Sequence, residues 1–168
     1  LPISYLPIGE VVSGFVMGGL IPMGIVAAVS STFDFSVLPV ALPLIISIGL
    51  IMMTNNTSDI EKDREAKRRT LPALLGRKKA VRLYRAAVWL WMALICILPV
   101  GYFGMWGLIS PVLFIVFARH TFVNLLRSPL VPQGRVGQMK GIIAANLFGN
   151  GAYLATLALV LFGGGTLG

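Results

Sequence analysis

Charged side chains are scarce in this sequence, and acidic ones are the scarcest. Only 12% of its 168 residues are charged, 57% are hydrophobic, and the mean hydropathy is +0.87. An average soluble domain has about 25% charged residues, so a lipid bilayer is the expected solvent. Six acids against fourteen bases give a formal net charge of +8. In a soluble protein this excess would indicate nucleic acid; here it first indicates membrane orientation, and no nucleic-acid partner is expected.

Cysteine and histidine are almost absent. The single cysteine, Cys96, excludes a disulfide within the chain and predicts no thiol metal site. The single histidine, His120, stands beside Arg119 without further ligands nearby in the sequence, so no catalytic role is assigned to it. The chain opens on Leu1 and lacks the basic start and cleavage site of a signal peptide. We therefore expect an N-terminal portion to be missing.

The sequence contains several long runs without any charged residue. A bilayer core about 30 Å thick needs about 20 apolar residues per helix. On that basis we predict an all-α, polytopic transmembrane bundle with five spans, forming a single domain over residues 1–168 that is part of a larger one. The spans are predicted at 11–33, 36–53, twice within 86–118, and from about 141 to 163. The run 86–118 is divided in two because it contains helix-breaking proline and glycine residues, namely Pro99, Gly101, Gly104, Gly107 and Pro111.

Loop charges give an independent test of this topology. Residues 55–85 hold ten bases and four acids, and residues 119–140 hold four bases and no acid. Short loops rich in lysine and arginine stay in the cytoplasm. Both loops are therefore predicted on the cytoplasmic side, which requires an even number of spans between them. The chain then starts inside and ends outside.

The most informative segment follows the second predicted span. Asn55, Asp59 and Asp63 are spaced four residues apart, so at about 100° per residue they fall within an arc of about 80° on one helix face. Oxygen ligands of this type suit Mg²⁺, which also bridges to substrate phosphates. Lys67 and Arg68 follow closely, and arginine binds phosphate oxygens well. This pattern predicts both halves of a magnesium–diphosphate site.

Two simpler interpretations remain open. A mixed-charge run is commonly a solvated helix face with i,i+4 pairs, such as Asp63 with Lys67, and composition alone favours that interpretation. The excess of bases also serves as a topological signal and an anchor for anionic lipid heads. The lipid interpretation does not explain why two asparagines and two aspartates stand in helical register at the mouth of an apolar span.

The same residues resemble the UbiA superfamily of membrane prenyltransferases. The second aspartate-rich motif of that superfamily has the form Asp-x-x-x-Asp, here Asp59 and Asp63. Within the superfamily, the chain is most similar to the 1,4-dihydroxy-2-naphthoate polyprenyltransferases of menaquinone biosynthesis. That similarity is carried by residues 55–77, by residues 9–18, and by Met139-Lys140 before the last span.

The resemblance implies a bundle of nine transmembrane helices, of which this chain supplies the last five, in a bacterial or archaeal-type cell membrane. Mg²⁺ would be held by two aspartate motifs and would bind the diphosphate of a polyprenyl donor at the cytoplasmic face. The acceptor would be an aromatic quinone precursor. The first aspartate motif lies on an earlier helix in the family, so the chain alone is expected to be inactive.

The resemblance also gives each residue an expected role. Asp59 and Asp63 are the expected metal ligands and catalytic residues, with Asn55 as a supporting ligand. The other expected substrate contacts are Asn56, Lys67, Arg68 and Lys140. Glu10 is either an acceptor contact or, as favoured, an interfacial carboxylate. The alternatives are a UbiA-type enzyme with another acceptor and a non-catalytic transporter or lipid-binding fragment.

Overall fold

The computed structural model describes residues 7–163, and every regular element in that range is helical, with no β-strand. Helical stretches that are long and apolar enough to cross a membrane are Gly9–Ser30, Val37–Ser58, Arg77–Arg127 and Pro132–Phe162. The prediction of an all-α membrane bundle is confirmed at this level.

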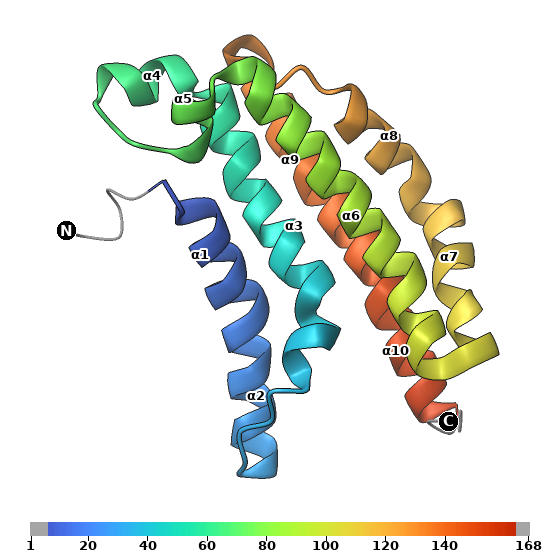
Figure 1. Cartoon of the computed structure of the whole chain (residues 1–168). Helices are drawn as coiled ribbons and strands as arrows, with labels where there is room; N and C mark the ends of the chain where they lie inside the picture. Colours follow the sequence, from blue (N-terminus) through green and yellow to red (C-terminus); the bar gives the residue numbers. More distant parts are fainter. Residues whose placement is uncertain (1–6, 164–168) are drawn as a thin grey trace.

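The first two membrane-length helices form a hairpin. The first consists of α1 (Gly9–Phe15), a π-helical turn (Val16–Leu20) and α2 (Ile21–Ser30), and α3 (Val37–Ser58) returns beside it (Figure 1). The connection turns where Ser31 adopts φ 59° and Asp34 Oδ1 accepts a hydrogen bond from the Ser36 backbone N–H at 2.8 Å. The turn predicted at Asp34 is confirmed.

Glycines set the distance between α1 and α3. A Cβ atom added to Gly14 would lie 2.4 Å from the backbone oxygen of Ile45, and one added to Gly18 would lie 2.6 Å from the Ile45 Cα. Small residues four apart allow membrane helices to approach backbone to backbone. Gly49 faces the carbonyl of Glu10 in the same way, at 3.1 Å. Glu10 is therefore held close against the C-terminal half of α3.

After two short helices, α4 (Ile60–Glu65) and α5 (Leu71–Leu75), the chain forms a second hairpin. The long helix α6 (Arg77–Phe103) descends, a 3₁₀ turn (Gly104–Leu108) reverses the direction, and α7 (Ile109–Leu113) leads through a π-helical turn (Phe114–Ala118) into α8 (Arg119–Arg127) (Figure 1). Gly104 has φ 54° and ψ −128°, a backbone conformation open essentially to glycine alone.

The last membrane-length helix comprises a 3₁₀ turn (Pro132–Gly134), α9 (Arg135–Ala145), a π-helical turn (Asn146–Asn150) and α10 (Gly151–Phe162). It starts before the predicted residue 141, and α6 starts before residue 86. Both extensions are polar. Helical hydrogen bonding continues past the apolar residues because charged side chains are easily solvated at the membrane surface.

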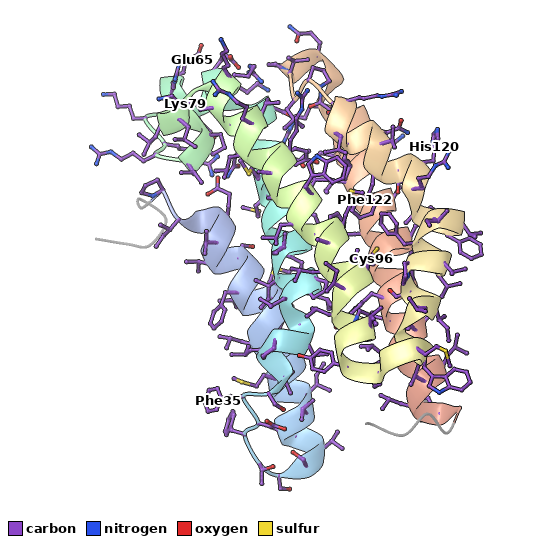
Figure 2. The ribbon with its side chains drawn as sticks, turned by 45° about the vertical axis from the view of Figure 1, so that its right-hand side comes forward. Phe35, Glu65, Lys79, Cys96, His120 and Phe122 are labelled. Carbon is purple, nitrogen blue, oxygen red and sulfur yellow. The ribbon has the colours of Figure 1, made fainter. Side chains whose placement is uncertain are left out.

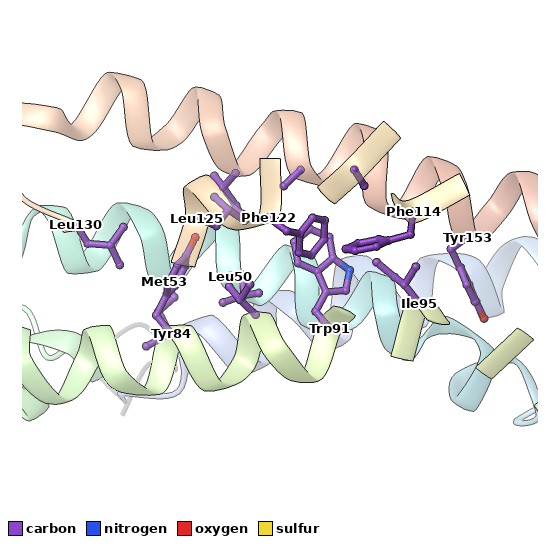
Figure 3. Close-up of a cluster of buried hydrophobic side chains, with 14 residues drawn as sticks. Leu50, Met53, Tyr84, Trp91, Ile95, Phe114, Phe122, Leu125, Leu130 and Tyr153 are labelled. Atoms are coloured by element: carbon purple, nitrogen blue, oxygen red, sulfur yellow. The ribbon is translucent and has the colours of Figure 1, made fainter. Parts of the chain in front are cut away.

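The helices pack around a cluster of large side chains (Figure 3). The rings of Trp91 and Phe122 have centroids 4.5 Å apart, and those of Phe114 and Phe122 lie 4.8 Å apart. Asn150 adds polar ties, accepting from Trp91 Nε1 at 3.0 Å and donating to Ser47 Oγ at 2.9 Å. These contacts join α3, α6, α8 and the last two π-helical turns through packing and hydrogen bonds, which drive helix association in lipid.

The two basic segments lie at the same end of the bundle. Figure 2 shows Glu65 and Lys79 at that end and Phe35 at the opposite one. Ser58 Oγ donates to Gln138 Oε1 at 2.7 Å, joining positions 80 residues apart. The loop charges predict that these two segments lie on one side of the membrane. In the structure they lie at the same end of the bundle, where polar side chains of both segments contact one another.

Candidate functional site

The candidate site is formed where α3 ends. The Asp59 N–H donates to the Asn55 carbonyl at 3.1 Å, and the Asp63 N–H donates to the Asp59 carbonyl at 2.9 Å. Helical register thus continues past α3 into α4, although Asp59 itself, at φ −103° and ψ 18°, interrupts the helix. The three predicted ligands therefore remain near neighbours, but their side chains join two separate networks.

Asn55 and Asp59 converge on Arg135, the first residue of α9. Arg135 Nε lies 3.0 Å from Asp59 Oδ2 and 3.3 Å from Asn55 Oδ1, and Arg135 Nη2 donates to Asn55 Oδ1 at 2.7 Å. The Asp59 side chain is 13% exposed, and its Oδ1 is buried without a hydrogen-bond partner among the described residues. Asn55 Oδ1 and Asp59 Oδ2 thus both contact the Arg135 guanidinium, and Asp59 Oδ1 keeps lone pairs that no described residue uses.

This arrangement fits a hard divalent cation. Mg²⁺ in phosphate-binding sites takes one or two protein carboxylates and completes its shell with water and substrate oxygens. Asn55 Oδ1 and the Asp59 carboxylate supply oxygens that already surround a positive group. In residues 7–163 no group of three or more His, Cys, Asp or Glu residues is placed to hold a metal.

Asp63 belongs to the second network, which closes the loop between α4 and α5. Its side chain is only 4% exposed; Oδ1 lies 3.2 Å from Arg68 Nη1, and Oδ2 accepts from Thr70 Oγ1 at 3.0 Å. Thr70 Oγ1 in turn accepts from the Ala73 N–H at 3.3 Å, capping α5. Asp63 thus orients the predicted phosphate ligand Arg68 and fixes the basic loop.

Asn56 points to the opposite side of α3, toward α1. Asn56 Nδ2 donates to Glu10 Oε1 at 2.8 Å, and both residues are 4% exposed. Asn55 Nδ2 approaches Asn56 Oδ1 at 3.4 Å. Asn55, Asn56 and Glu10 thus form one hydrogen-bonded chain that begins at Arg135.

A pocket of about 240 Å³ lies beside Glu10. Its walls come from α1, α3, α5 and α6, and Glu10 is the only charged residue that lines it within the described chain. Glu10 Oε2 is buried and has no hydrogen-bond partner in residues 7–163. An apolar pocket with one well-placed polar group is the usual form of a small-molecule site.

Arg77 contacts several segments at this end of the bundle. Its Nη1 donates to the Thr57 carbonyl at 2.7 Å and to the Leu130 carbonyl, and its Nη2 lies 2.6 Å from Glu61 Oε2. The hydrogen bond from Arg77 holds the pKa of Glu61 below its ordinary value. One side chain therefore joins the end of α3, the start of α6, α4 and the segment before α9.

The remaining predicted site residues lie at the surface. Lys67 and Lys140 are exposed, and neither side chain forms a hydrogen bond or ion pair with the described residues. Arg68 is exposed apart from its contact with Asp63. Sequence reasoning treated Arg135 only as a loop charge and missed its role, although its place in an acid-free loop before the last helix was a usable signal.

Comparison with known proteins agrees with this architecture. Residues 1–130 match the UbiA prenyltransferase family. Over 120 residues the chain is 33% identical to a Bacillus subtilis (strain 168) protein named 1,4-dihydroxy-2-naphthoate octaprenyltransferase; the match covers 70% of this chain and 36% of that protein. The chain thus spans about a third of the length of that relative. No solved structure matches. The family match covers well over half of the sequence, and the chain therefore belongs to the UbiA prenyltransferase family.

Proposed function

We propose that this chain is part of a magnesium-dependent enzyme that transfers a polyprenyl group from polyprenyl diphosphate to an aromatic acceptor, 1,4-dihydroxy-2-naphthoate in menaquinone biosynthesis. Family membership and the name of the Bacillus relative support the reaction class and this acceptor. The proposal includes five membrane crossings, because the stretch Arg77–Arg127 folds back at Gly104. These are the last five of nine, with the polar end in the cytoplasm.

The observation that carries this proposal is the convergence of Asn55 Oδ1 and Asp59 Oδ2 on one guanidinium. The Asp59 and Asp63 carboxylates would repel a bare diphosphate. When bound, Mg²⁺ supplies the positive charge that reverses this repulsion and neutralises the leaving group. Asn55 and Asp59 are the residues that would hold it.

The basic residues have a separate part in the reaction. Arg135, released from Asp59, provides a planar donor for phosphate oxygens. Arg68, oriented by Asp63, is a second donor at the same end of the bundle. Lys67 and Lys140 stay as proposed phosphate contacts. Positive groups placed where negative charge develops lower the barrier to departure of the diphosphate.

The allylic C–O bond breaks with its electron pair going to the diphosphate oxygen. The ring carbon that carries the carboxylate forms the new C–C bond to the allylic carbon. The bond from this ring carbon to the carboxylate then breaks, CO₂ leaves, and the electron pair of that bond restores the aromatic ring. An apolar cavity around the isoprenoid tail would exclude water, which would otherwise capture the electrophilic carbon.

The proposal is tested with the full-length protein in detergent, using labelled polyprenyl diphosphate and dihydroxynaphthoate. Asp59→Ala and Asp63→Ala are expected to lower turnover by about 100-fold or more. Removing divalent cations by chelation should stop transfer, and Mg²⁺ should restore it. The matched control is Glu65→Gln, an exposed acid at the same end (Figure 2), which should retain turnover. Full activity in both aspartate variants would refute the site.

A further inference from the structure

We infer that the pocket beside Glu10 binds the aromatic acceptor, with Glu10 Oε2 accepting a hydrogen bond from a ring hydroxyl. This inference rests on the proposed function. It assigns the acceptor to a site on the α1 side of α3, whereas Arg135 and the proposed metal ligands lie on the α9 side.

The first support is an unmet hydrogen-bonding requirement. Glu10 is 4% exposed, and its Oε2 has no partner among the described residues. Buried polar atoms are almost always partnered, because an unpartnered one costs about 1–3 kcal/mol. A carboxylate only accepts hydrogen bonds. The missing partner is therefore a donor, and a ligand hydroxyl supplies one.

The second support is that Glu10 is held in a fixed orientation. Asn56 Nδ2 donates to Oε1 at 2.8 Å, which leaves Oε2 as the carboxylate oxygen without a partner among the described residues. The backbone of Glu10 packs against Gly49, where a Cβ atom would lie 3.1 Å from the Glu10 carbonyl. A carboxylate fixed by packing and by a neighbouring amide is preorganised for binding.

The third support is the size and lining of the pocket. A cavity of about 150 Å³ lined by apolar residues holds benzene, so the volume of about 240 Å³ suits a two-ring aromatic. The walls include Ile46, Met53, Leu83 and Ala87, and methionine sulfur contacts aromatic rings favourably.

The fourth support is the connection to the diphosphate site. Asn55 accepts from Arg135 at 2.7 Å, and its Nδ2 approaches Asn56 Oδ1 at 3.4 Å. Asn56 then reaches Glu10, so both proposed substrate sites adjoin the last two turns of α3. A hydroxyl that donates to a carboxylate gains electron density, and this density is shared with the ring carbon that attacks the allylic centre.

The first test replaces Glu10 by glutamine in the full-length protein. Gln has the same shape but places either an amide N–H₂ or an uncharged oxygen at the hydroxyl. We expect the KM for dihydroxynaphthoate to rise about 10-fold or more, equivalent to about 1.4 kcal/mol, while the KM for polyprenyl diphosphate changes less than about twofold. Fluorescence titration of dihydroxynaphthoate without donor or metal should show the same loss of affinity. Glu65→Gln is the matched control.

The second test fills the pocket and does not depend on folding of the Glu10 variant. Ala87 lines the pocket, whereas its neighbour Ala86 is exposed on another face of α6. Ala87→Phe should weaken binding of dihydroxynaphthoate, and Ala86→Phe should not. If Ala87→Phe instead raises only the KM of the prenyl donor, the pocket holds the prenyl tail and the inference is wrong.

Different results would refute the proposed function and the proposed acceptor site. Wild-type protein that transfers no prenyl group to an aromatic acceptor refutes the proposed function, and this inference with it. Wild-type protein that is active, with an unchanged acceptor KM and affinity in Glu10→Gln, refutes only the acceptor site.

Discussion

Replacing Gly18 by alanine should separate α1 from α3. The added Cβ would lie 2.6 Å from the Cα and N atoms of Ile45, well inside the optimum of about 3.5–4.0 Å for carbon contacts. Backbone atoms cannot rotate away as a side chain does, so the helices must move apart. Overpacking of this kind costs about 1–3 kcal/mol. For 150–250 residues this cost corresponds to a fall in Tm of about 2–12 °C, and the larger full-length protein should show a fall near the lower end of that range.

The measurement is thermal unfolding of the full-length protein in detergent, followed by the fraction that remains monodisperse after heating. Gly24→Ala is the matched control, because it lies on the same membrane-length helix and a Cβ there meets nothing within 4 Å. Equal Tm values for the Gly18 and Gly24 variants would show that the α1–α3 interface does not depend on glycine.

Two further variants test other contacts. Arg135→Ala should raise the KM for polyprenyl diphosphate about 10-fold or more, because it removes the proposed phosphate donor. Arg135→Lys should recover part of this loss, and an unchanged donor KM would contradict the proposed role. Asn150→Ala leaves the buried Trp91 N–H without its acceptor at 3.0 Å, so it should lower the free energy of unfolding by about 1–3 kcal/mol. The control is Asn124→Ala, which changes an exposed asparagine on α8. The Tm of Asn150→Ala should lie below that of Asn124→Ala.

Hydropathy and charge predicted the features that depend on whole segments. The membrane-length helices, the turn at Asp34 and the common end of the two basic segments follow from many residues acting together, so single exceptions do not disturb them. The helices α6 and α9 begin before the charge-free runs that predict the spans. Charge-free runs mark the hydrocarbon region, whereas hydrogen bonding in the backbone continues into the polar surface.

Side-chain partners could not be predicted in the same way. The spacing of Asn55, Asp59 and Asp63 correctly kept them in helical register, but it could not show that Asp63 would bind Thr70 and Arg68. Arg135 meets Asn55 across 80 residues of sequence, and Asn56 meets Glu10 across 46. Such pairs depend on how helices pack, which no local pattern contains.

The position of Arg77 has a consequence for the loop before α9. Surface loops usually tolerate inserted residues, because few contacts fix their length. Here one guanidinium joins the Leu130 carbonyl to the Thr57 carbonyl, only five residues before Arg135 and two before Asp59. The path from Leu130 to Arg135 is thereby anchored at both ends. An added residue in it would change the reach of Arg135 toward Asp59, so the length of this loop is set by the Arg135–Asp59 ion pair.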